Sequence, residues 1–316
     1  MSDKRGQSRG NLGVGAAADK SRRHFQISTP AEVAGGGELS AEPAAVPGIE
    51  AARTMYAALY GELALHPRPG IGDERSQDAY SLFYARSAAM GWLTPAIENA
   101  EGGLWGMNDA EAGPSAGPQP SRVAFFQVVL TGPAQGKLLP VQPFLACAGD
   151  VVARLGTPRL AAVQVLLPEH DADADAQFAS PSGMRTSGAL LNAINWFADC
   201  DPRQRVRVRV TLDGLADPAI RAAAPRIVEW VRGINQDVFA CDSLSLADDD
   251  HLVLLPTTTF LGGPDSDHHR VTFRGTLAEW SLDALGWLAA FLADVSSQQG
   301  VTTPLMLTAD RSSPTG

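Results

Sequence analysis

The chain of 316 residues contains little lysine and little cysteine. Only three of its 25 basic residues are lysines, and its net charge is −10. Binding to nucleic acid by counterion release needs clustered positive charge, so this balance argues against a general nucleic-acid binder. The three cysteines are too few and too scattered for a disulfide framework or a cysteine-type zinc site. We therefore expect a reduced, cytoplasmic protein.

Long hydrophobic runs are also missing. No uncharged apolar stretch approaches the roughly 20 residues that span a bilayer, and no signal-peptide pattern opens the chain. We therefore expect no contact with a membrane. Hydrophobic residues still make up 45% of the chain, which is enough to form a sizeable core. The preference for arginine over lysine, with abundant alanine, glycine and proline, indicates a GC-rich bacterial genome.

The composition divides the chain into five parts. Residues 1–47 are rich in small residues without apolar periodicity, which predicts a disordered tail. Residues 48–108 show helical spacing and predict a small helical subdomain, and the Pro- and Gly-rich stretch 109–120 predicts a linker. Residues 121–311 form the main predicted domain, and 312–316 a short C-terminal tail. The apolar face of the first predicted helix consists of Ile49, Ala52, Met55, Tyr56, Leu59 and Leu63.

Strand and helix signals alternate within residues 121–311. The run Arg122–Thr131 is almost continuously apolar, which favours a strand buried on both faces. The helix expected over Ser281–Gln299 is apolar on nearly every side, so we expect it to be covered on more than one side. This alternation predicts an α+β or α/β fold, in which a mixed β-sheet is built from βαβ-like units with packed helices.

Two predicted strands carry arginine on one face. Arginine and valine alternate over 203–210, and a similar alternation follows over 270–277. Because side chains point to opposite faces at successive strand positions, the valines should be buried and the arginines should share the other face. The candidate binding residues are Arg203, Arg205, Arg207, Arg209, Arg270 and Arg274.

Three readings of this arginine-lined face are open. It is a solvated sheet face, or it docks an acidic partner such as the acidic segment 48–107 of the same chain, or it binds phosphate groups or RNA. Buried charges need partners, so a covered face requires carboxylates opposite the arginines. The absence of aromatic residues among the arginines disfavours RNA.

Polar loops gather carboxylates and histidines, the ligands of hard and borderline metal ions. An HxxDxD pattern is followed some 90 residues later by a DHH triplet, and this order resembles that of the DHH phosphoesterases. The resemblance implies a metal-dependent hydrolase. The triplet here follows a polar stretch rather than a buried strand, so we keep this reading as the alternative. Its metal ligands would be His170, Asp173, Asp175, Asp267, His268 and His269.

No group of residues in the sequence combines a nucleophile, a base and an orienting side chain. We therefore interpret the chain as a non-catalytic interaction or assembly module that uses its arginine-lined sheet face. The expected partner is another protein or a second copy of the chain, and no cofactor is expected. The metal-dependent hydrolase and the anion- or RNA-binding module are the alternatives.

Overall fold

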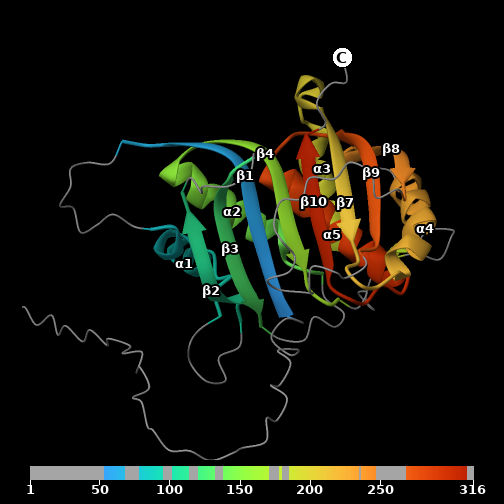
Figure 1. Ribbon diagram of the computed structural model, residues 1–316, viewed down its shortest axis with the longest axis horizontal. Helices are drawn as coiled ribbons and strands as arrows, with labels where there is room; N and C mark the ends of the chain where they lie inside the picture. Colours follow the sequence, from blue (N-terminus) through green and yellow to red (C-terminus); the bar gives the residue numbers. More distant parts are fainter. Residues whose placement is uncertain are drawn as a thin grey trace, which may run out of the picture. The chain divides into compact units, whose positions relative to one another are not determined.

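The computed structural model describes residues 53–67, 78–94, 102–113, 120–131, 138–170, 178–179, 185–234, 236–246 and 268–311. Within these residues, eight strands form a sheet in the order β2-β3-β1-β4-β10-β7-β9-β8 (Figure 1). The strands are β1 (Thr54–Leu65), β2 (Trp105–Ala112), β3 (Arg122–Leu130), β4 (Gly156–Leu167), β7 (Val206–Asp213), β8 (Phe239–Ser245), β9 (Arg270–Leu277) and β10 (Leu305–Arg311). The helices are α1 (Ala79–Ala89), α2 (Val141–Leu155), α3 (Gly188–Ala198), α4 (Ala219–Gly233) and α5 (Leu282–Gln298).

The sheet consists of two consecutive copies of one topology. The first half is β1-α1-β2-β3-α2-β4 and the second is β7-α4-β8-β9-α5-β10. In each half the fourth strand pairs with the first, the first with the third, and the third with the second. This is the split βαβ arrangement of ferredoxin-like folds. The sequence shows no residue-level repeat, so the duplication is visible only in the topology.

The two halves meet where β4 pairs with β10. The antiparallel ladder runs from the pair Leu167–Leu305 to the pair Ala162–Asp310 and joins the fourth strand of each half. An approximate two-fold axis therefore passes through this seam, perpendicular to the sheet. Helix α3 and the short hairpin β5 (Phe178–Ala179) and β6 (Arg185–Thr186) lie between the halves in sequence and have no counterpart in the repeated order.

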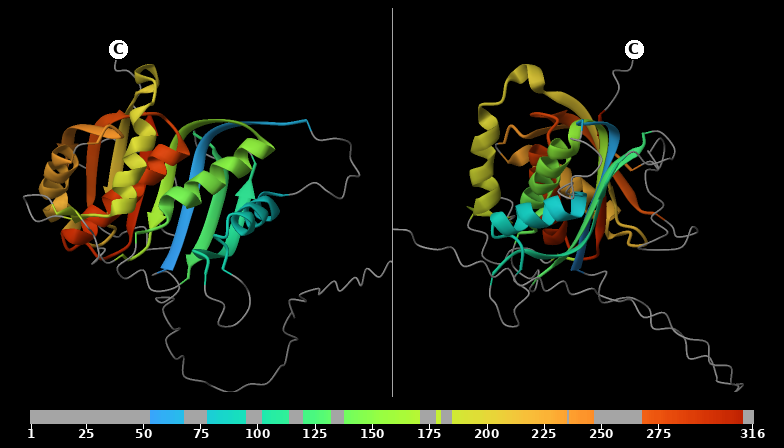
Figure 2. Two further views of the ribbon diagram at one scale, coloured as in Figure 1. Left: turned by 180° about the vertical axis from the view of Figure 1, so that it is seen from behind. Right: turned by 90° about the vertical axis from the view of Figure 1, so that its left-hand side faces the viewer.

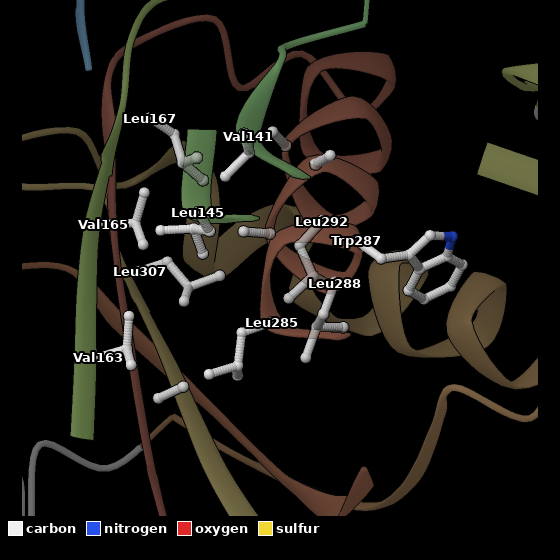
Figure 3. Close-up of a cluster of buried hydrophobic side chains, with 14 of the residues drawn as sticks. Val141, Leu145, Val163, Val165, Leu167, Leu285, Trp287, Leu288, Leu292 and Leu307 are labelled. Atoms are coloured by element: carbon white, nitrogen blue, oxygen red, sulfur yellow. The ribbon is translucent and has the colours of Figure 1, made fainter. Parts of the chain in front are cut away.

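All five helices contribute to the core on the same face of the sheet (Figure 2). Inner side chains of β4 and β10 face those of α2 and α5 across this core (Figure 3). The two helices cross closely, because a Cβ atom at Gly286 would lie only 2.7 Å from the Cα of Gln142. A larger residue at Gly286 would force α2 and α5 apart.

Helix α5 is covered on two sides. Leu285, Leu288 and Leu292 point towards the sheet, whereas Trp287 points away from it (Figure 3). The indole nitrogen of Trp287 donates a hydrogen bond to the backbone oxygen of Leu190 in α3, at 2.9 Å. Nearly the whole helix is buried as a result. The sequence-based expectation for this helix is confirmed.

The α+β class is confirmed, but the strand directions differ from the expected mixed sheet. Every ladder in the eight-stranded sheet is antiparallel. The βαβ units exist, but each is split: in the first half β3 lies between β1 and β2, and β1 lies between β3 and β4. Strands joined by a helix are therefore never neighbours, which removes the parallel pairs.

The helix predicted near residues 49–63 is wrong. Thr54–Leu65 is a strand, and its residues from Met55 to Tyr60 are all buried. Because β1 and β2 both pair with β3, residues 54–112 contribute to the same sheet and do not form a helical subdomain; within 48–108 only α1 is a described helix. The predicted linker begins inside β2, which ends at Ala112.

Both predicted tails lie outside the described residues. They are the tail 1–47 and the C-terminal tail 312–316. Among the helices that the structure describes, none has both the length and the apolar character needed to cross a membrane.

Candidate binding face

The face of the sheet opposite the helices carries four of the predicted arginines. We call Arg207, Arg209, Arg270 and Arg274 the arginine face. Arg209 on β7 stands directly opposite Arg274 on β9, and Arg270 stands opposite Asp213. The inner side of β7 is apolar, with Val208 and Val210 buried and Val206 half-buried. The predicted facing of this strand is therefore confirmed.

Two arginines of this face are neutralised by carboxylates from the same sheet. The Nε atom of Arg209 donates to Oδ2 of Asp310 on β10 at 2.9 Å, and Nε of Arg270 donates to Oδ2 of Asp213 at 2.8 Å. All four side chains are at most 18% exposed. Charge-assisted hydrogen bonds of this kind satisfy a largely buried guanidinium.

The other two arginines remain available to solvent. The Arg207 side chain is 77% exposed, and its nearest described carboxylate, Asp242, lies 4.0 Å away. Arg274 is exposed and makes no ion pair with any residue that the structure describes. The arginine face therefore keeps positive charge that the described part of the sheet does not neutralise.

Arg203 and Arg205 do not belong to this face. Pro202–Gln204 forms a short 3₁₀ turn, and β7 begins only at Val206. Proline at the first position suits such a turn and cannot donate to a strand ladder. Arg205 instead lies 3.8 Å from Asp237, in an exposed ion pair. The predicted alternation extends further along the sequence than the strand does.

A polar row crosses the outer face of the sheet from β4 to β9 and passes between the Arg209–Arg274 pair and the Asp213–Arg270 pair. Gln164 on β4 donates to Thr308 on β10 at 3.3 Å, and the hydroxyls of Thr211 and Thr272 hydrogen-bond at 3.0 Å. The register places Thr308 opposite Thr211, so the row crosses four neighbouring strands. Polar pairs at directly opposite positions stabilise a sheet face without apolar cover.

The outer face of the first half carries an apolar cluster, which Met306 of β10 completes, next to polar residues such as Gln127 opposite Tyr56. Tyr56 donates its hydroxyl hydrogen to the sulfur of Met306 at 3.3 Å, and Tyr60 donates to Gln164 at 3.4 Å. Burial raises the pKa of both tyrosines well above the usual range. This outer apolar cluster consists of Tyr56, Ala58, Tyr60, Phe125, Ala162, Leu166 and Met306, all nearly inaccessible to solvent.

The described histidines of the proposed metal site contact different carboxylates. His268 Nδ1 lies 2.8 Å from Oδ2 of Asp213, the atom that also accepts from Arg270. His170 is buried beside α5, with Nε2 3.9 Å from Oδ1 of Asp294. His269 contributes backbone hydrogen bonds to the turn after β7. Among the residues that the structure describes, no three His, Cys, Asp or Glu side chains converge on one ion. Asp173, Asp175 and Asp267 lie outside those residues.

The partner carboxylates Asp213 and Asp310 were missed by sequence reasoning. Asp213 continues the alternation of β7 and was detectable as the next outward position after Thr211. Asp310 lies 101 residues after Arg209, and its pairing depends on the register of two strands distant in sequence. No local pattern contains that information.

No protein-family model, curated protein or solved structure matches this chain in the comparisons made.

Proposed function

We propose that this protein is a non-catalytic interaction module that binds an acidic segment of a partner protein on its arginine face. The observation that supports this most directly is the opposition of Arg209 and Arg274 across β7 and β9. Like charges at directly opposite positions destabilise a sheet. Asp310 pairs with Arg209, and a carboxylate from a partner beside Arg274 would relieve the repulsion between Arg274 and Arg209.

An acidic protein fits this face better than RNA does. The described outer positions around the arginines hold threonine and serine, as in Thr211, Thr272 and Ser243, with no aromatic ring among them. RNA and single-stranded DNA are bound by stacking bases on aromatic rings, and the described part of this face offers none. Guanidinium groups in a fixed array pair well with carboxylates.

The state of the cysteine thiols also favours a binding role over nucleophilic catalysis. Burial raises the pKa of the Cys147 thiol to about 11. Burial is also the main cause of the raised pKa values of Cys200 and Cys241. A thiol attacks as its thiolate, so the raised pKa values disfavour the reactive form of all three groups.

Calorimetric titration with an Asp- and Glu-rich peptide tests this proposal. At low salt, Arg274→Glu and Arg207→Glu should each weaken binding by about tenfold or more, because exposed charges govern association with a charged partner. Arg226→Glu is the matched control, since it makes the same charge change at an exposed position of α4, on the helical side. Its effect should be less than about twofold.

Two results would overturn the proposal. Equal weakening by all three variants would mean that only net charge matters. Tighter binding of a single-stranded RNA than of the acidic peptide, lost in the same two variants, would show an RNA-binding face instead.

A further inference from the structure

Helices α2 and α5 occupy equivalent positions in the two halves, yet among the helices that the structure describes only α5 has another helix on its outer side. Helix α3 lies further from the sheet than α5 does (Figure 2) and covers Trp287. No described helix covers the outer side of α2, and Asp150, Ala153 and Arg154 are exposed there. Within the described residues, the first half therefore has no counterpart of α3.

A groove of about 560 Å³ opens at this uncovered position, between α1 and α2. Its aliphatic part comes from Leu82, Ala85 and Ala89 of α1, and its rim contains Arg154, which makes no ion pair with any described residue. The remaining charges, Arg86 and Asp150, pair with each other at 2.7 Å. The groove thus combines an aliphatic part with a charged rim, on which Arg154 has no ion-pair partner among the described residues.

Helix α3 presents a surface that matches this groove. Leu190 and Phe197 anchor the helix to the core, and the opposite side is exposed. Gly188–Ala198 contains no charged residue, and Trp196 is 71% exposed. Ala189, Asn192, Trp196 and Asp199 follow one another at spacings of three, four and three residues, so they form one stripe along the exposed side.

We propose that two copies of this chain associate about a two-fold axis, with α3 of each copy in the α1–α2 groove of the other. Both α3 and the α1–α2 groove lie on the helical side of the sheet. In a dimer with a two-fold axis, the contact between α3 of one copy and the groove of the other is therefore made twice. Trp196 enters the aliphatic part of the groove. Tryptophans buried in a pocket of the partner are among the residues that contribute most to binding energy. Asp199 then meets Arg154, so the charges are complementary.

This association goes beyond the proposed function and uses the opposite face of the sheet. The arginine face stays accessible in the dimer. The two proposals can therefore fail separately, because loss of self-association should leave binding of an acidic peptide unchanged.

Sedimentation equilibrium of the full chain over a range of concentrations tests the dimer. Trp196→Ala and Ala85→Lys should each raise the dimer dissociation constant at least about tenfold, because one removes the anchor and the other fills the groove. Both positions are exposed, so the melting temperature should not change at low concentrations, where the wild-type chain is also monomeric. Ala222→Lys, the same change at an exposed position of α4, is the matched control and should have no effect.

Mixing the two variants distinguishes this interface from any other. A Trp196→Ala copy keeps an intact groove and an Ala85→Lys copy keeps an intact tryptophan, so an equimolar mixture should form heterodimers with one complete contact. Reversing the charges in Arg154→Asp or Asp199→Arg should weaken the dimer, and combining both changes should restore it. A wild-type chain that is monomeric at all concentrations, or a dimer insensitive to both Trp196→Ala and Ala85→Lys, would overturn the proposal.

Discussion

The first and second halves of the sheet share one topology but differ in the chemistry of their outer faces. In the first half, tyrosine, phenylalanine and leucine form a nearly inaccessible apolar cluster. In the second half the equivalent face carries arginines, carboxylates and threonines. The inner faces of both halves are uniformly apolar, because both lie under helices. The fold therefore requires apolar residues on the inner face of each half, whereas the residues on the outer faces can differ between the halves.

The largest effect is expected where the inner face of the second half is given a charge. Val208 is 1% exposed on the inner side of β7. Val208→Asp should unfold the protein, because an unpaired buried charge costs several kcal/mol against a total stability of about 5–15 kcal/mol. Circular dichroism and thermal melting measure this outcome.

The neighbouring outer position provides the control. Arg207→Glu should leave the melting temperature nearly unchanged, since the side chain is mostly exposed. Unfolding by Arg207→Glu, or tolerance of Val208→Asp, would contradict the assignment of the two faces.

Replacing the Arg209–Asp310 ion pair by apolar residues, as on the outer face of the first half, should have an intermediate effect on the free energy of unfolding. Asp310→Leu alone should cost about 2–3 kcal/mol, because the largely buried Arg209 loses that carboxylate. Combining it with Arg209→Leu should recover most of this loss, as apolar replacement of a buried pair is close to neutral. Urea unfolding of both single variants and the double variant gives the coupling energy. Additive losses would show that the two side chains act independently.

The apolar outer face of the first half should make the protein sensitive to alkali. The pKa values of Tyr56 and Tyr60 are raised in the folded state. Stability should therefore fall above about pH 10, where unfolded-state tyrosines ionise, by up to about 1.4 kcal/mol per pH unit for each residue. Tyr56→Phe should reduce this slope in urea unfolding between about pH 9 and pH 11. A slope unchanged in Tyr56→Phe would mean that other groups cause the alkaline loss.

The smallest effect concerns an exposed ion pair of the first half. Arg86 and Asp150 approach to 2.7 Å, but their side chains are 42% and 53% exposed. Asp150→Asn should cost less than about 1 kcal/mol, as is usual for surface pairs. A loss as large as that of Asp310→Leu would remove the contrast between exposed and buried pairs in the two halves.

The sequence allowed the strands of the second half and the direction of their side chains to be predicted. Alternation over Val206–Val210 is a local property, and one buried face is enough to set it. The same reasoning failed for β1, where Met55 to Tyr60 are buried on both faces and no alternation exists. A continuous apolar run also satisfies helical spacing, so periodicity alone cannot separate the two.

The candidate site was predicted only in part, because the facing of its arginines is a local property but their pairing with carboxylates is not. Arg207, Arg209, Arg270 and Arg274 were identified because their facing is local. The carboxylates that neutralise two of them come from the register of β7 with β9 and β10, strands far apart in sequence. Arg203 was assigned wrongly, because alternation continued through a turn that Pro202 begins.

The seam between β4 and β10 has a consequence for how the two halves hold together. Two separate chains that paired along these strands would lose translational and rotational freedom on association. Here both strands belong to one chain, so each half meets the other at a high effective concentration set by the connecting segments. The seam can therefore remain stable with a polar pair, Gln164 and Thr308, on its outer side. The covalent connection therefore provides stabilisation that an apolar interface would have to supply between separate chains.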